Sequence, residues 1–274
     1  MENNNEKIYK CFLNITAKMI DIYNGANIEN RKVKYLPEWL DFYTTQLLEE
    51  NKNNYKLYST YKRGTIIYVN LGSNIGNEFS GNHFCIVMDK KDNPKKSTLT
   101  VVPLSSKNST HYKQLTSSIF DITIDELNKE AKELTEEADK IGDFANLIMD
   151  KHESYIKSKA KRSALLFKFG YLTEGYIDKQ YEEIENLIKE EANNFKEKIS
   201  KMKKKAENIK LVRKVFNRHK NKQSYANAAA ITTISKKRIQ KINNEDPTGK
   251  IRISKEDLAE IDKQIKIRFI NSWI

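Results

Sequence analysis

A helical pattern of about ninety residues, lying between two stretches of strand-like sequence, limits the folds open to this chain. After Ile124 the apolar residues recur every three or four positions, which is the spacing of an amphipathic helix. One apolar stripe runs from Ile124 to Ile141, and a second, near-heptad stripe runs from Ile177 to Ile209. Because each stripe can cover the other, the sequence predicts a long helical hairpin, similar to an antiparallel coiled coil, inserted into another structure.

Strand-like sequence flanks this insertion on both sides. Before it, runs of β-branched and aromatic residues predict a meander of strands at residues 65–71, 84–88, 99–104 and 119–122. A glycine-containing loop, residues 72–82, separates the first two strands. Strand-like sequence returns after the insertion at residues 231–234. We therefore expect a small β-structure that the insertion interrupts and that the C-terminal part of the chain completes.

Helices are expected at both ends of the chain. Residues 6–23 have the apolar spacing of an amphipathic helix, and a second short helix is expected to begin at Pro37, because proline is tolerated in a first turn. The buried face of that second helix would be Trp39, Phe42 and Leu47. A closing helix would be capped by Ser254, with Asp257 at its third position. Helices and a separate set of strands together predict the α+β class.

The charge balance is strongly basic, with a formal net charge of +12. This excess favours a polyanionic partner such as nucleic acid, although a solvated Lys-rich surface would give the same count. Twelve Lys and Arg lie between Lys196 and Lys222 with only two Glu, which is typical of a nucleic-acid-binding strip. Seven acidic residues lie between Asp125 and Asp139, however, and a hairpin would set the two runs side by side.

Membrane, disulfide and metal chemistry find little support in the sequence. Residues 1–10 are polar, and no apolar run approaches the roughly eighteen residues of a membrane span, so we expect a cytoplasmic protein without membrane contact. Cys11 and Cys85 are interpreted as packed thiols. No Cys and His with ligand spacing and no paired carboxylates occur on the strand segments, so no metal ion or other cofactor is expected.

Three separated pieces of the sequence resemble the MazF/PemK family of toxin endoribonucleases. Residues 62–72, followed by Gly76, Glu78 and Gly81 and then by residues 101–105, resemble the opening of that family. Residues 233–239 are similar to its later Arg-Thr-Ile-Asp-Lys-x-Arg-Leu motif, and residues 258–265 are similar to its closing helix. The resemblance covers about residues 61–123 and 224–270.

The resemblance implies an SH3-like small β-barrel of the MazF/PemK/CcdB type, split by the helical hairpin. Its parts would be an N-terminal helical extension at 1–60, a first barrel part at 61–123, the insertion at 124–223, and a second barrel part with the C-terminal helix at 224–274. The implied activity is metal-independent, sequence-selective cleavage of single-stranded RNA to a 2′,3′-cyclic phosphate. The implied protein partners are a second copy of the chain, as a homodimer, and a cognate antitoxin.

The implied catalytic positions carry His83 and Ser105. The family has arginine where this chain has His83, and histidine can itself serve as a general acid or base. Ser105 keeps the hydroxyl of the family threonine and would donate to the transition state. The family's arginine and aspartate around its Thr-Ile pair are replaced by Thr232 and Ser235. His83 and Ser105 could instead be ordinary residues at strand ends.

The remaining residues assigned to the RNA groove come from both halves of the barrel: Arg63, Glu78, Phe79, Asn82, Ser106, Lys107 and Arg238. Glu78 could alternatively hold its own loop through backbone N–H groups. Two further functions stay open. One is a toxin of the same fold that binds a protein such as DNA gyrase through Ser272, Trp273 and Ile274, and the other is a non-catalytic RNA-binding regulator.

Overall fold

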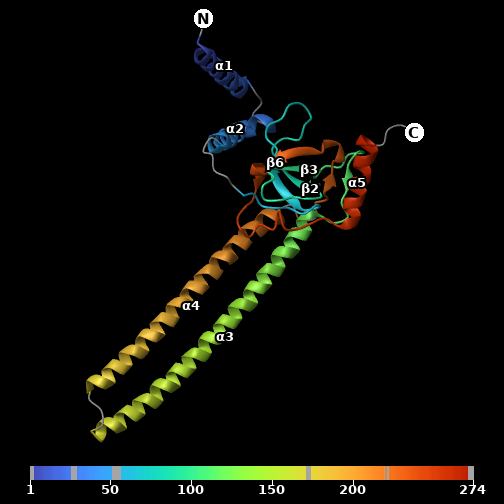
Figure 1. Ribbon diagram of the computed structural model, residues 1–274. Helices are drawn as coiled ribbons and strands as arrows, with labels where there is room; N and C mark the ends of the chain where they lie inside the picture. The colour runs from blue at the N-terminus through green and yellow to red at the C-terminus, as the bar shows by residue number, and fades with distance from the viewer. Residues whose placement is uncertain are drawn as a thin grey trace. The chain divides into compact units, whose positions relative to one another are not determined.

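The computed structural model describes residues 3–25, 30–50, 57–170, 174–218, 220 and 222–270 (Figure 1). The C-terminal residues 272–274, which the gyrase-type alternative requires, lie outside the described residues. The chain divides into two compact units. The first contains residues 1–122, 221–241 and 247–274, and the second contains residues 123–220 and 242–246.

The first unit is built on an antiparallel sheet, and the predicted α+β class is confirmed. Three central strands form the predicted meander: β1 (Ile66–Asn70), β2 (Asn82–Val87) and β3 (Thr98–Ser105). Four short strands surround them: β4 (Lys113–Gln114), β5 (Tyr225–Ala226), β6 (Thr232–Ser235) and β7 (Ile239–Gln240). The 3-10 helices η1 (Ala228–Ala230) and η2 (Lys236–Arg238) lie between them in sequence.

Strands from both sides of the long insertion pair with one another. The sheet order is β4-β5-β3-β2-β1-β7, and β6 pairs with β3. β5, which follows the insertion, pairs with β4, which precedes it, through Lys113 and Ala226. Across the described residues the path is open, so the expected closure into a barrel is not observed. β4, β5 and β7 have two residues each, which is too short for a continuous wall.

The core of this unit lies on the sheet. Alternate residues of β1, β2 and β3 point to one face and are completely buried, among them Ile67, Cys85 and Val101, and Ile234 of β6 joins them. Ile66 and Ile86 point to the other face and are also fully buried. Burying each such side chain is worth about 1.5–3 kcal/mol, so this two-sided burial fixes the register of the three central strands.

One predicted strand is wrong. Residues 119–122 form the first turn of α3 (Ile119–Lys168) instead of a fourth strand. The buried Ser118 precedes this turn, and its hydroxyl accepts a hydrogen bond from the N–H of Phe120 at 3.2 Å, which satisfies one donor of the helix end. A short apolar run fits a buried helical turn as well as a strand, and this local cap favours the helix.

The two N-terminal helices are α1 (Asn4–Gly25) and α2 (Arg31–Glu50). The first agrees with the prediction, but the predicted start of the second at Pro37 is wrong. Asn30 caps α2 instead, because its Oδ1 accepts a hydrogen bond from Lys32 N–H at 3.0 Å, and Pro37 lies inside the helix. Trp39 and Phe42 are half-buried as expected, whereas Leu47 is 43 % exposed.

The closing helix, α5 (Lys255–Phe269), begins as predicted. Ser254 is its N-cap, and its hydroxyl accepts a hydrogen bond from Asp257 N–H at 3.0 Å. The buried carboxylate of Asp257 in turn accepts hydrogen bonds from the N–H and the hydroxyl of Thr116, at 3.0 and 2.8 Å. α5 is thereby tied to the segment that follows β4.

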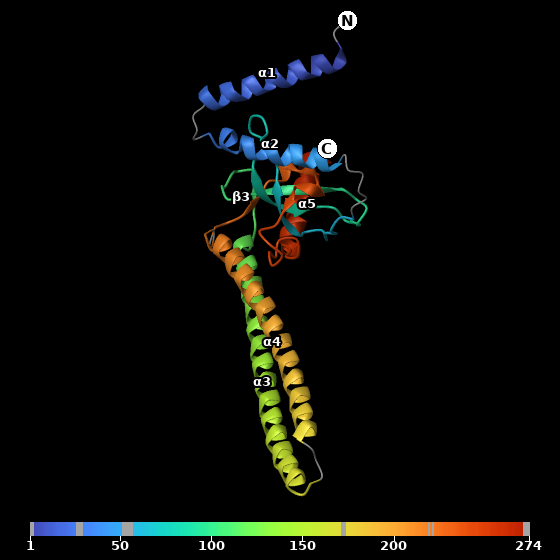
Figure 2. The ribbon, with the colours of Figure 1, turned by 90° about the vertical axis from the view of Figure 1, so that its left-hand side faces the viewer.

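The second unit consists mainly of α3 and α4 (Glu174–Asn217), which run side by side in both views (Figures 1 and 2). Leu127 and Leu134 of α3 and Val212 and Phe216 of α4 are buried. Farther along, His152 Nε2 lies 3.0 Å from a carboxylate oxygen of Glu191. The stripe predicted for α4 begins with Ile177, whose side chain lies outside those described. None of the described helices combines the length and apolar content that crossing a bilayer requires.

Candidate functional site

His83 and Ser105 meet at neighbouring strand ends. The ladder between β2 and β3 ends at the pair of Cys85 and Pro103, and His83 and Ser105 each lie two residues beyond that pair. The Nδ1 of His83 lies 3.2 Å from the carbonyl oxygen of Leu104, the residue before Ser105. The structure therefore brings together the two residues that the sequence assigned to catalysis.

The ring of His83 is held from both sides by backbone carbonyls. Its Nε2 lies 3.1 Å from the carbonyl oxygen of Ser80, opposite the contact with Leu104. Carbonyl oxygens only accept hydrogen bonds, so a neutral imidazole can donate to one of them and a doubly protonated imidazolium to both. The edge of Phe79 packs against the ring at a centroid distance of 4.9 Å. His83 is thus fixed in place as a hydrogen-bond donor.

A structured loop between β1 and β2 carries Glu78 and Phe79. Its ends are joined by a hydrogen bond from Gly81 N–H to the carbonyl of Gly72 at 2.7 Å, and both glycines have positive φ, of 82° and 87°. The side chain of Asn74 donates to the carbonyl of Phe79 at 2.7 Å. The side chain of Glu78 is exposed on this loop, and the amide of Asn74 supports the loop.

A cavity of about 220 Å³ lies beside His83, between this loop and α2, and is called the α2 cavity below. Its walls combine aromatic, amide and charged side chains, as a site for nucleotides would. The lining residues are Arg31, Lys32, Tyr35, Glu38 and Trp39 of α2 together with Tyr68, Asn70, Gly72, Ser73, Ser80, Gly81, Asn82 and His83. Of the residues predicted to contact RNA, Asn82 lies directly in this cavity.

Arg238 lies at the edge of the same region. Its Nη1 donates to the carbonyl of Leu71 at 3.3 Å, and its guanidinium carbon lies 5.0 Å from the centre of the Trp39 ring. Burial lowers the pKa of the Arg238 guanidinium from its ordinary value. The side chain is therefore partly withdrawn from water beneath an aromatic ring, in a cation–π contact.

Other predicted groove residues lie away from the α2 cavity. The guanidinium of Arg63 contacts the carbonyl of Met88 and forms an ion pair with Asp262 of α5. Ser106 and Lys107 are exposed just after β3, and the N–H of Lys107 donates to the hydroxyl of Ser105 at 3.0 Å. The structure does not bring these three residues to the lining of the cavity.

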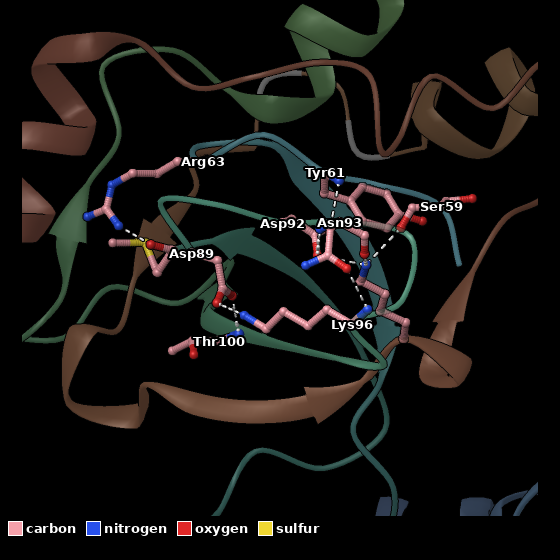
Figure 3. A network of polar contacts seen from close by, with 10 residues as sticks. Ser59, Tyr61, Arg63, Asp89, Asp92, Asn93, Lys96 and Thr100 are labelled. Atoms are coloured by element: carbon pink, nitrogen blue, oxygen red, sulfur yellow. Dashed lines mark hydrogen bonds and ion pairs between the residues drawn. The ribbon is translucent and has the colours of Figure 1, made fainter. Parts of the chain in front are cut away.

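A buried ion pair, not foreseen from the sequence, ties η2 to the first half of the chain. Lys236 Nζ lies 2.8 Å from Asp92 Oδ1, with 2 % and 1 % of the two side chains exposed. Asp92 Oδ2 also accepts a hydrogen bond from the N–H of Tyr61 at 2.9 Å, as Figure 3 shows. Burial alone would raise the pKa of Asp92, but hydrogen bonds from Lys236 and from backbone N–H groups bring it below its usual range.

The structure also explains one departure from the family pattern. Ser235, which stands where the family has aspartate, is the N-cap of η2, and its hydroxyl accepts a hydrogen bond from Lys237 N–H at 3.3 Å. Serine and aspartate are equally good capping residues. The substitution therefore preserves the local structure that places Lys236 and Arg238. Thr232, at the other departure, is exposed on β6.

Sequence reasoning missed the part that α2 plays. Lys32 contacts the loop and Trp39 contacts Arg238, whereas the sequence predicted only that the N-terminal helices pack against the barrel and that Trp39 is on a buried face. Lys236 occupies the lysine position of the later family motif, and this match was the signal that could have indicated a structural role for it. Among the residues that the structure describes, no group of three or more His, Cys, Asp or Glu is arranged to hold a metal ion.

The antiparallel sheet, with a histidine and a serine at strand ends and a polar cavity beside the histidine, defines an α+β protein with a candidate site. A family model described as the PemK-like, MazF-like toxin of type II toxin-antitoxin systems matches residues 62–139. The predicted resemblance to the MazF/PemK-like family is therefore confirmed over this segment, which covers less than half of the chain. A search of curated proteins found no significant match.

The matched segment has a defined place in the fold. It contains β1 to β4 and the first turns of α3, and so includes both His83 and Ser105. The strands β5, β6 and β7 and the helix α5 lie after it, although β5 and β6 pair with β3 of the matched segment.

Proposed function

We propose that this chain is the toxin of a type II toxin-antitoxin system and acts as a metal-independent endoribonuclease on single-stranded RNA. The observation that carries the proposal is the meeting of His83 with the Ser105 end of β3, inside the segment matched by the toxin family. An imidazole and a hydroxyl can together supply proton transfer and a donor to a pentacovalent phosphate. The positive net charge of the chain supports a polyanionic substrate.

In this proposal His83 is the acid–base group and Ser105 donates a hydrogen bond to the phosphorane oxygen. His83 takes the proton of the 2′-hydroxyl, whose oxygen attacks the adjacent phosphorus. The bond to the 5′-oxygen breaks, that oxygen takes up a proton from the protonated His83, and a 2′,3′-cyclic phosphate remains. Asn82 lies beside His83 on the cavity wall and is suited to reading a base edge. Phe79 holds the ring of His83 through its edge contact.

The proposal extends to the assembly of the protein. We place the functional unit in the cytoplasm, where messenger RNA is found, as a homodimer of SH3-like domains that an antitoxin inhibits. Arg238 would contribute a cation to the RNA path, because its guanidinium donates a hydrogen bond to the carbonyl of Leu71, just before the loop. The hairpin of α3 and α4 would be an insertion within this domain, since β4 and β5 pair across it.

One experiment tests the activity directly. Purified full-length protein is incubated with a long RNA in EDTA, the cut ends are sequenced, and the 3′ ends are examined for cyclic phosphates. His83→Ala is expected to lower the cleavage rate by about 10²- to 10⁴-fold, the usual contribution of a general acid or base. His111→Ala, at an exposed histidine, is the matched control and should cleave normally. Intact RNA with the native protein would contradict the nuclease assignment.

A further inference from the structure

Helix α2 is fastened to the loop that borders the candidate site. Lys32 Nζ donates hydrogen bonds to the carbonyl of Asn74, at 2.8 Å, and to the carbonyl of Gly76. The hydroxyl of Ser73 donates to the carbonyl of Lys32 at 3.4 Å. A lysine ammonium spread over two loop carbonyls, with a return contact from the loop, holds the first turn of α2 against the loop.

A second contact lies about two turns farther along α2, at Trp39. The indole packs so closely on Gly72 that a Cβ added there would stand 2.8 Å from the ring. The same indole covers the guanidinium of Arg238. At the far end of the helix, Lys237 Nζ lies 3.1 Å from a carboxylate oxygen of Glu50. α2 therefore contacts the site region along most of its length.

The groups that α2 engages are those that a single-stranded RNA would need. Trp39 occupies the face of Arg238 that a base or a phosphate would approach, and Glu50 neutralises Lys237. Arg31, Tyr35 and Glu38 form the wall of the α2 cavity opposite Asn82 and His83. An aromatic ring on an arginine and a carboxylate on a lysine are the same chemistry that a base and a phosphate offer.

The attachment of α2 is nevertheless shallow. No described side chain of α2 is buried, and Tyr35 and Leu48 are 44 % and 66 % exposed. A helix held by polar contacts and by side chains that are at most half-buried, such as Trp39 and Phe42, carries less of the apolar burial that fixes the sheet. Such a helix can leave its position without disturbing the core of β1, β2 and β3.

We propose that α2 is an autoinhibitory cover, which competes with single-stranded RNA for the surface around Arg238, the Gly72 to Gly81 loop and His83. This inference rests on the proposed nuclease function, because it concerns the regulation of the same site. The covered form holds Arg238 under Trp39 and closes the α2 cavity on one side. The uncovered form exposes both to an extended polyanion. RNA binding and the docking of α2 then exclude each other.

The first test loosens the cover in the full-length chain. Trp39→Ala removes the indole from Arg238 and Gly72, and Leu48→Ala, at an exposed position of the same helix, is the matched control. Binding is measured by fluorescence anisotropy with a 2′-O-methyl RNA, which cannot be cleaved, and the rate is measured in EDTA with the unmodified RNA. Trp39→Ala should increase both by roughly three- to thirty-fold, the range that a cation–π contact converts to. Leu48→Ala should change neither.

The second test locks the cover in place. Lys32→Cys and Ser73→Cys, introduced together at two positions already in contact, can form a disulfide between α2 and the loop. Cys11→Ser removes the exposed native thiol, and Cys85 can stay because burial raises the pKa of its thiol and keeps it unreactive. The oxidised protein should bind the 2′-O-methyl RNA at least about tenfold more weakly than the reduced protein. Circular dichroism confirms that each variant is folded.

The outcomes separate this inference from the proposed function. Tighter binding by Trp39→Ala without cleavage by any form supports the cover and contradicts the nuclease. Cleavage at one rate by the native, Trp39→Ala and oxidised proteins contradicts the cover and supports the nuclease. Absence of RNA binding by every form overturns both.

Discussion

At the scale of single residues, a substitution at His83 can separate two roles of this side chain in cleavage, as a positive charge and as a proton donor or acceptor. His83→Arg introduces a permanent cation that can donate to the carbonyls of Leu104 and Ser80, but an arginine stays protonated and cannot exchange a proton with the substrate. We expect His83→Arg to bind RNA as the native chain does and to cleave at least about tenfold more slowly, because general acid–base catalysis contributes more than that. Single-turnover cleavage and anisotropy measure the two quantities separately. If the native rate is retained in His83→Arg, the charge of residue 83 is sufficient and the proton must move through another group.

Ser105 provides a second test at the scale of single residues. Ser105→Thr restores the family's hydroxyl and should cleave within about threefold of the native rate, whereas Ser105→Ala should lose about tenfold or more, as donors to developing charge do. Equal rates for Ser105→Ala and the native protein would remove Ser105 from the mechanism.

At the scale of elements, the pair of Lys236 and Asp92 joins η2 to the turn after β2. Lys236→Ala leaves a carboxylate buried without its partner, so we expect the free energy of unfolding to fall by about 3–5 kcal/mol. Urea denaturation monitored by circular dichroism measures this loss. Lys241→Ala, at an exposed lysine nearby in sequence, is the control and should change the value by less than about 0.5 kcal/mol.

The same pair gives the first unit a pH dependence. Because the pKa of Asp92 is lower in the folded than in the unfolded protein, the unfolded chain binds more protons as the solution is acidified. The stabilisation is complete above the ordinary aspartate pKa of about 3.9 and is lost as the pH falls through the lower folded value. Asp92→Asn should remove this part of the acid dependence. An unchanged difference between pH 6 and pH 3 in that variant would contradict the assignment.

The element scale also shows how far sequence reasoning reaches. β1, β3, β6 and the cap of α5 follow local patterns, namely alternation and a serine three residues before Asp257, and were predicted. The start of α2 was missed because the capping side chain of Asn30 outweighs the preference of Pro37 for a first turn. The positions of His83 and Ser105 at strand ends were predicted from the order of the family-like motifs. The packing of Trp39 on Gly72 was not predicted, because packing between distant elements leaves no periodic signal in the sequence.

At the scale of the whole molecule, the two units differ in how their burial is distributed. In the helical unit, Leu127 and Val212 are fully buried, whereas Met149 and Leu187 are 70 % and 58 % exposed. Local opening should therefore be easier around Met149 of α3 and Leu187 of α4 than near Leu127 and Val212. Hydrogen exchange followed by mass spectrometry should show protection that decreases from Leu127 toward Met149 in α3 and from Val212 toward Leu187 in α4. Uniform protection over α3 would show that another chain covers the exposed residues.

The pairing of β4 with β5 has a consequence for synthesis on the ribosome. Gln114 emerges long before its partner Tyr225, and the lysine that neutralises Asp92 emerges later still. The nascent chain therefore carries His83 and Ser105 for the whole time in which α3 and α4 are being translated, while β3 lacks its neighbours β5 and β6. If α3 and α4 associate as they emerge, they shorten the loop that must be closed and bring the two halves together. A protein arranged in this way would acquire its finished sheet only after β5, β6 and β7 have been translated.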